Sequence, residues 1–153
     1  MGIDELSMSP SKVRTVKSLL AALTEEESRE NEEICSPVDG VLVAMEDIPD
    51  EAFAGGMLGQ CVGVIPENGN IYSPCNGTVT MIAESGHAIG IRSEKGRELL
   101  IHVGINTVTL HGTGFTCCVG KGDSVRLGEQ IMTADLELIH SAGLDTTVII
   151  AVQ

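Results

Sequence analysis

The sequence has no tryptophan and only three aromatic residues in 153, namely Phe53, Tyr72 and Phe115. The core must therefore be built from Val, Ile, Leu, Met and Ala, which are among the residues most often buried. No run approaches 18 consecutive apolar residues, so direct membrane insertion is not expected. The beginning of the sequence also lacks the basic and then apolar pattern of a signal peptide, which predicts a cytoplasmic protein.

Basic side chains are scarce, with nine Lys and Arg against 22 Asp and Glu and a net charge of −13. Nucleic acid and anionic membranes would repel such a chain, so neither is an expected partner. The five cysteines are odd in number and show no CxxC spacing, which predicts reduced thiols. Cys117 and Cys118 are a poor metal pair, because neighbouring side chains of a strand point to opposite faces.

Eighteen glycines and many short apolar runs between turn residues predict an all-β fold. We expect an antiparallel β-sandwich or flattened barrel over residues 34–153, with one or two short helical turns. The only helical pattern in this region covers Asp135–Ala142. Ser36-Pro37 and Ser73-Pro74 begin two related turns. The predicted strands are Gly40–Met45, Gly59–Pro66, Asn70–Ser73, Gly77–Ala83, His87–Arg92, Glu98–Val103, Asn106–Leu110, Phe115–Val119, Ser124–Leu127, Glu129–Ala134 and Thr147–Val152.

Residues 1–33 differ in character from the rest of the chain. Apolar residues between Val13 and Leu23 fall on one helical face, with Ser11 as the predicted N-cap. An acidic run from Glu25 to Glu33 follows and contains no apolar residue. We interpret this part as an amphipathic helix followed by a solvated linker.

The stretch from residue 85 to residue 114 organises the chain, because two strand-like runs there flank the polar turn 93–97. Each run carries one histidine, His87 and His102. We predict a loop with an even number of residues, in which the two histidines face each other across the ribbon. The alternative is a three-residue loop with Gly96 in the left-handed conformation, which shifts the register by one residue. On spacing alone, two unrelated strand histidines are a further alternative.

Several motifs agree in order and spacing with one known family. They are Leu100-Ile101-His102-Val103-Gly104-Ile105-Asn106-Thr107-Val108, Leu110-His111-Gly112-Thr113-Gly114-Phe115, Ser85-Gly86-His87-Ala88, Pro37-Val38-Asp39-Gly40, Ile48-Pro49-Asp50-Glu51-Ala52-Phe53 and Asp145-Thr146-Thr147. Over residues 34–153 the chain resembles the glucose-type enzyme IIA domains of the bacterial sugar phosphotransferase system.

The resemblance implies a phosphoryl carrier that functions in sugar uptake. It implies that His102 accepts a phosphoryl group on Nε2 from the phosphocarrier HPr and passes it to a cysteine of the IIB domain of a sugar permease. It also implies that His87 lies beside His102 and is required for transfer. An attacking imidazole must be neutral with one nitrogen free, so its other nitrogen must hold a proton in a hydrogen bond. The turn at Gly104 is the expected source of the carbonyl acceptor.

Further residues are assigned supporting roles by their place in these motifs. Ser85 is expected to orient His87 through its hydroxyl, or else to be an exposed turn residue. Asp50 matches the pattern of the family that the chain resembles, whereas Asn106 stands where many members of that family carry Asp. The residues expected to dock partners are Phe53, Leu100 and Val108. His111 and His140 are expected to be exposed and not catalytic.

Two other classes of function remain as alternatives. A regulatory protein could bind its targets according to its phosphorylation state. A biotinyl or lipoyl carrier module would place its lysine in a turn like 43–46, but Glu46 occupies that place and no attachment amine exists there. No cofactor is expected, and two histidines are too few ligands for a resident zinc ion. The sugar and any fusion to a membrane permease are left open.

Overall fold

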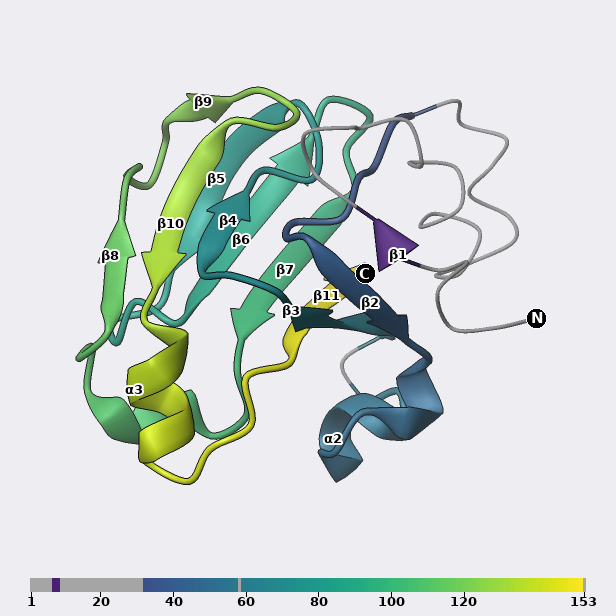
Figure 1. The fold of residues 1–153 in the computed structure, drawn as a ribbon. Coiled ribbons are helices and arrows are strands. Elements are labelled where there is room, and N and C mark those ends of the chain that lie inside the picture. The colour runs from purple at the N-terminus through teal and green to yellow at the C-terminus, as the bar shows by residue number, and fades with distance from the viewer. Residues whose placement is uncertain (1–6, 9–31, 58, 153) are drawn as a thin grey trace.

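The computed structural model describes residues 7–8, 32–57 and 59–152. Its strands form two antiparallel sheets that pack as a sandwich, which confirms the predicted fold class (Figure 1). The larger sheet has the strand order β1-β2-β3-β11-β7-β6-β5-β9 and the smaller one β4-β10-β8. The strands are β1 (Ser7–Met8), β2 (Gly40–Val43), β3 (Gln60–Pro66), β4 (Asn70–Tyr72), β5 (Gly77–Ile82), β6 (Ala88–Ser93), β7 (Glu98–Val103), β8 (Phe115–Cys117), β9 (Ser124–Val125), β10 (Gln130–Ala134) and β11 (Val148–Val152).

Among the described residues the helical elements are short, and the α-helices α2 and α3 lie at the end of the sandwich where β7 ends (Figure 1). They are α2 (Glu51–Ala54) and α3 (Leu136–Ser141), with the 3₁₀ turns η4 (Met45–Asp47) and η5 (Thr107–Leu110). Within the described part of the chain, no helix is long and apolar enough to cross a membrane. The helix predicted between Val13 and Leu23 lies outside the described residues.

Strand β11 is the centre of the larger sheet, between β3 and β7, and all five of its residues are buried. Its even-numbered residues join the main core between the sheets. Its odd-numbered residues, Ile149 and Ala151, join a second cluster with Ile48, Phe53, Cys61 and Ile105 on the other face. Because both faces are covered, the strand is apolar throughout instead of alternating. The second cluster holds η4 and α2 against the sheet.

The β6–β7 hairpin has the three-residue loop that was the alternative, and the predicted facing register of the histidines is wrong. Arg92 pairs with Glu98, and His102 pairs with Ala88 instead of His87. Gly96 has a φ of 90°, and its N–H donates to the Ser93 carbonyl at 2.9 Å. A left-handed residue at the last loop position is typical of this hairpin class, and glycine adopts that conformation without a steric cost.

Four predicted strands differ from the structure by two residues or more, and two of them, predicted to end at Val119 and Leu127, end at Cys117 and Val125. Residues 106–110 form η5 instead of a strand, because Gly104 and Asn106 both have positive φ, 79° and 60°, and reverse the chain there. The strand predicted over Gly40–Met45 ends at Val43, and Met45 begins η4. Helix α2 was not predicted, because four residues are too few for a helical period to be visible.

Contacts between the beginning of the domain and the hairpin were also not predicted. Glu32, expected in a solvated linker, instead accepts hydrogen bonds from Ser93 Oγ at 2.9 Å, from the Lys95 N–H at 3.0 Å and from Arg97 Nε at 3.0 Å. The side chains of Glu32 and Arg97 are only 8% and 9% exposed. Glu32 is therefore attached to the hairpin loop by three hydrogen bonds.

The two Ser-Pro turns have the same internal geometry. Each serine hydroxyl donates to the carbonyl two residues further on, at 2.6 Å for Ser36 and 2.7 Å for Ser73. The turns also exchange backbone hydrogen bonds, from Cys35 to Pro74 and from Tyr72 to Pro37. The relation between the turns that the sequence suggested is therefore confirmed. The two backbone hydrogen bonds join the segment before β2 to the segment between β4 and β5.

Candidate active site

His102 lies on the outward face of β7, near the end of the strand. The strand alternates between half-buried and buried residues, so Leu100 and His102 face outward while Leu99, Ile101 and Val103 enter the core. Neighbouring strands hold the backbone of His102 on both sides, through Ala88 of β6 and Ile149 of β11. The histidine therefore projects from a strand that is paired on both sides.

His87 lies beside His102, although the two residues are not paired across the hairpin. The imidazole rings have centroids 4.8 Å apart and meet edge to face at 80°. His87 immediately precedes β6, after Gly86 with its φ of 74°, so its side chain is not constrained to alternate with that of Ala88. Its carbonyl accepts the Val103 N–H at 2.8 Å, which ties it to the end of β7. The juxtaposition is as expected, but its geometric reason is different.

The tautomer of His102 follows from one hydrogen bond. Its Nδ1 lies 2.8 Å from the carbonyl oxygen of Gly104. A carbonyl can only accept, so Nδ1 must carry the proton and Nε2 of the neutral ring has a free lone pair. The carbonyl comes from the turn residue that the sequence indicated. His102 thus has the protonation pattern that a nucleophilic imidazole needs.

Both imidazoles favour the neutral form. Burial lowers the pKa of His102 from its usual 6.5, and the neighbouring His87 lowers it further, whereas the hydrogen bond to Gly104 and the charge of Asp50 act in the opposite direction. Burial also lowers the pKa of His87. His87 is 8% exposed, and its Nδ1 has no hydrogen-bond partner among the described residues. The pair is therefore neutral at pH 7 and lacks part of its hydrogen bonding.

Phe53 supports His102 from beneath and is not an exposed docking residue. It is 5% exposed, and its ring centroid lies 5.2 Å from that of His102. Helix α2 positions it, because the Asp50 side chain caps the helix by accepting the N–H groups of Ala52 and Phe53 at 2.9 and 3.3 Å. Asp50 therefore has two effects, since it holds Phe53 and its charge acts on His102.

The other residues singled out in the sequence differ in exposure. Leu100 is partly buried beside the second cluster, and Val108 is 50% exposed. Asn106 is exposed and makes no side-chain cap to η5. Ser85 is half-buried, but its hydroxyl does not supply a partner to His87 Nδ1. His111 and His140 are exposed, as expected.

Sequence reasoning gave no role to the residues that hold the Gly104 turn. Thr107 is fully buried and donates its hydroxyl to the Val103 carbonyl at 2.6 Å. The loop before β11 accepts the next two backbone donors, with Gly104 N bonded to the Thr147 carbonyl and Ile105 N to the Asp145 carbonyl, each at 2.9 Å. The Asp145-Thr146-Thr147 motif was the available signal, since Asp commonly begins such turns.

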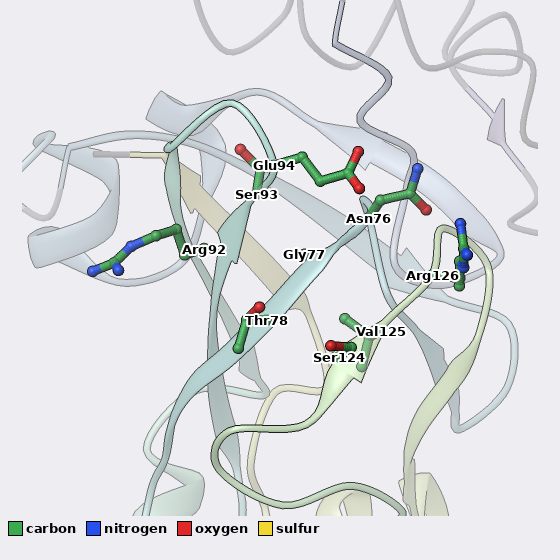
Figure 2. Close-up of a pocket in the computed structure, with 9 residues that line it drawn as sticks. All are labelled: Asn76, Gly77, Thr78, Arg92, Ser93, Glu94, Ser124, Val125 and Arg126. Carbon is green, nitrogen blue, oxygen red and sulfur yellow. The ribbon is translucent and has the colours of Figure 1, made fainter.

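A separate pocket of about 360 Å³ lies at the other end of the β6–β7 hairpin, and none of its lining residues belongs to the histidine site. Figure 2 shows Arg92 and Arg126 on opposite sides of this pocket, with their guanidinium groups turned away from each other. Arg92 pairs with Glu98, and the Ser93 hydroxyl donates to Glu32. The polar groups around it therefore do not converge as they do in a ligand site.

The described residues contain no cluster of three or more His, Cys, Asp or Glu side chains that could hold a metal ion. All five cysteines are free thiols, and burial raises the pKa of Cys61 and Cys75, to about 12 for Cys75. The chemistry of the site is therefore that of two neutral imidazoles, one of which has a fixed tautomer.

A β-sandwich that presents a neutral, oriented histidine beside a second buried histidine has the features of a histidine-based group-transfer domain. The family model described as phosphoenolpyruvate-dependent sugar phosphotransferase system, EIIA 1, matches residues 32–153. The chain belongs to this family, and it is a phosphoryl carrier of the sugar phosphotransferase system.

Relatives occur both as separate EIIA proteins and as parts of longer proteins. The chain is 40% identical over 120 residues to the glucose-specific EIIA component of Bacillus cereus, covering 78% of this chain and 73% of that protein. It is 44% identical over 119 residues to the glucose-specific EIICBA component of Streptococcus pneumoniae, covering 78% of this chain but only 16% of that protein. The solved structure of glucose permease IIA from Mycoplasma capricolum matches with a TM-score of 0.71 and 30% identity, covering 76% of this chain and 77% of that one.

Proposed function

We propose that His102 is the residue that carries the phosphoryl group, and that Nε2 is the atom to which the group is attached. The observation that carries this proposal is the 2.8 Å hydrogen bond between His102 Nδ1 and the Gly104 carbonyl. It leaves Nε2 as the free nucleophile of a ring whose pKa is lowered by burial. Neither His111 nor His140 has a comparable environment, because both are exposed.

In the accepting step, the phosphoryl group moves from the donor imidazole of HPr to the imidazole of His102. The N–P bond to the donor ring breaks as the bond from phosphorus to His102 Nε2 forms, and the electron pair of the broken bond stays on the donor ring. The phosphorylated ring of His102 keeps its Nδ1 proton and gains positive charge. The Gly104 carbonyl dipole stabilises that charge. In the onward step the thiolate of the IIB cysteine forms a bond to phosphorus as the bond to His102 Nε2 breaks, and the electron pair of the broken bond returns to Nε2.

His87 is proposed to stabilise the phosphoryl group during transfer. Phosphoryl transfer proceeds through a loose transition state with charge spread over three equatorial oxygens. The His87 ring lies 4.8 Å from that of His102, and we propose that its Nε2–H donates to one of these oxygens. A donor held in place before the reaction needs no reorganisation as charge develops.

The proposed partners are HPr as phosphoryl donor and the cysteine of a IIB domain as acceptor. The relatives named EIICBA and EIIBCA carry an EIIA part within one chain, and their printed names refer to glucose and to β-glucosides. We propose that this chain serves uptake of a sugar of this class. We propose that these partners cover the half-exposed Val108 and the partly buried Leu100, which lies on the same face of β7 as His102.

The experiment is labelling from phosphoenolpyruvate in the presence of enzyme I and HPr. We expect the wild-type protein to acquire one acid-labile and base-stable label, as a phosphohistidine is, and His102→Ala to acquire none. His111→Ala is the matched control and should label fully. Full labelling of the His102 variant, or an acid-stable label, would refute the assignment.

A further inference from the structure

The carbonyl that sets the tautomer of His102 belongs to a peptide unit that is held from the opposite side. The N–H of this unit is that of Ile105, and it donates to the Asp145 carbonyl at 2.9 Å. Because a peptide unit is planar, its C=O and N–H point in opposite directions. Holding the Ile105 N–H therefore fixes the direction in which the Gly104 carbonyl points toward His102 Nδ1.

The preceding donor is held by the same loop. Gly104 N–H donates to the Thr147 carbonyl at 2.9 Å, so two successive N–H groups bind two carbonyls that are two residues apart. The turn at Gly104 is thereby fixed in both position and rotation. A bond to the N–H also polarises the carbonyl of the same peptide, which strengthens the bond that this carbonyl accepts from His102.

The side chain of Asp145 gives the loop its shape. Its Oδ1 accepts the Thr147 N–H at 2.7 Å, which closes an Asx turn over residues 145–147. Asp145 itself is exposed, whereas Thr147 is 5% exposed and packs against Gly63 of β3. The Asp145 carboxylate thus makes a local hydrogen bond to the backbone. The backbone carbonyls of Asp145 and Thr147 accept hydrogen bonds from Ile105 and Gly104, beside His102.

We propose that Asp145 is a positioning residue for phosphoryl transfer, whose carboxylate holds the loop that aims the Gly104 carbonyl at His102 Nδ1. The consequence is that Asp145 keeps His102 in the tautomer with Nε2 free. This inference rests on the proposed role of His102, but the effect on the tautomer exists in the unphosphorylated protein and can be measured without any transfer.

Two substitutions separate the shape of the turn from its charge. Asp145→Asn removes the charge but keeps an oxygen at the same distance from the backbone, so the Asx turn can still form. Asp145→Glu keeps the charge but moves the carboxylate one methylene further away, so this turn cannot close. If Asp145 acts by position, the Asn variant should resemble the wild type and the Glu variant should not.

The experiment is ¹⁵N NMR of the imidazole nitrogens in the unphosphorylated protein, at a pH where His102 is neutral. We expect wild type and Asp145→Asn to show Nδ1 protonated, and Asp145→Glu to show a mixture of the two tautomers. Acceptance of the phosphoryl group from HPr should be about tenfold slower in the Glu variant, because a misplaced nucleophile loses alignment. Thermal unfolding confirms that each variant is folded.

The matched control is Asp123→Ala, which also breaks a short bond from an exposed aspartate to a backbone N–H, Gly120 N at 2.8 Å. Asp123 precedes β9, whose partner residues on β5 lie toward the hairpin loop, and its loss should leave the tautomer unchanged. An unchanged tautomer in the Glu variant would overturn the proposal, as would a shifted tautomer in the Asn variant. Labelling that survives in His102→Ala would instead remove the proposed function and leave the result on the tautomer standing.

Discussion

The two ends of the β6–β7 hairpin treat buried polar groups in opposite ways. At the loop end, the Glu32 carboxylate accepts from a hydroxyl, a backbone N–H and a guanidinium, all within 3.0 Å. At the other end, His87 Nδ1 is buried without a partner among the described residues. A protein gains stability by satisfying buried polar groups, and it tolerates unsatisfied ones where a reaction will use them. The loop end therefore contributes stability, and the histidine end gives some up.

The largest effect on stability is expected from Glu32→Ala. This substitution removes a charge partner of Arg97 in a site where both side chains are nearly buried, and we expect the free energy of unfolding to fall by about 3 kcal/mol. Labelling of the folded variant should be unimpaired, because the histidine end is untouched. Urea unfolding and the labelling assay measure the two quantities.

Glu33→Ala is the control for this prediction, since Glu33 is the exposed neighbour. We expect it to change the free energy of unfolding by less than about 0.5 kcal/mol. If both variants lost the same stability, the long-range bonds of Glu32 would be of no consequence and the comparison between the two ends would fail.

At the histidine end, His87→Gln should slow phosphoryl transfer and change stability little, which is the reverse of the effect expected for Glu32→Ala. Gln keeps an N–H donor but lacks the imidazole, so His102 should still be labelled while transfer to the IIB cysteine slows by about 10²-fold, as for a lost transition-state donor. Stability should change much less than in Glu32→Ala. Stopped-flow or quench-flow transfer to a IIB domain measures the rate, with His111→Gln as the exposed control. Unimpaired transfer would reduce His87 to a neighbour.

The difference between the two ends also explains how far the sequence could be interpreted. Local patterns predicted β7 with its observed bounds, Glu98–Val103, and β11 within one residue. They also brought His87 and His102 together. The contacts of Glu32 bridge 61 to 65 residues of sequence and have no local signal, so the acidic run was interpreted as solvated.

The errors near the site have a common physical cause. The register of the hairpin depends on whether Gly96 adopts a positive φ, and glycine permits either outcome. The strand predicted over Asn106–Leu110 failed because Asn106, like Gly104 before it, has a left-handed backbone that its apolar neighbours do not reveal. Phe53 was expected at the surface, but burial of α2 against the sheet is a tertiary effect. The proximity of the two histidines and the carbonyl acceptor at Gly104 were predictable, whereas the register of the hairpin and the 3₁₀ turn that follows Gly104 were not.

A smaller expected effect is a pH dependence of the free energy of unfolding that arises at the histidine end. The pKa values of His87 and His102 lie below the usual 6.5 in the folded protein, mainly because of burial. In the unfolded chain these residues bind protons as the pH falls below about 6.5, while in the folded protein they resist doing so. Their contribution to stability is therefore complete above that pH and is lost as the pH falls through the folded pKa values.

We expect the free energy of unfolding to fall between pH 7.5 and pH 5.5, and to fall less steeply in His87→Gln. Urea titrations at a series of pH values measure this difference. His111→Gln should keep the slope of the wild type, because His111 is exposed. Equal slopes in all three proteins would mean that the buried pair does not resist protonation.

The smallest effect is expected from Asn106→Asp, which would add a charge at the histidine end without changing its hydrogen bonds. Asn106 has a φ of 60° and its side chain does not cap η5. Asp tolerates the left-handed conformation as Asn does, and little strain should follow. A carboxylate about 8 Å from a phosphoryl dianion would destabilise the phosphorylated state by about 1 kcal/mol in a water-like dielectric, and salt would weaken the effect. The phosphoryl equilibrium with HPr should therefore shift toward HPr by up to about fivefold at low salt and less at 0.15 M. An equilibrium that stays constant while the melting temperature falls would mean that Asn106 serves the turn and not the charge of the site.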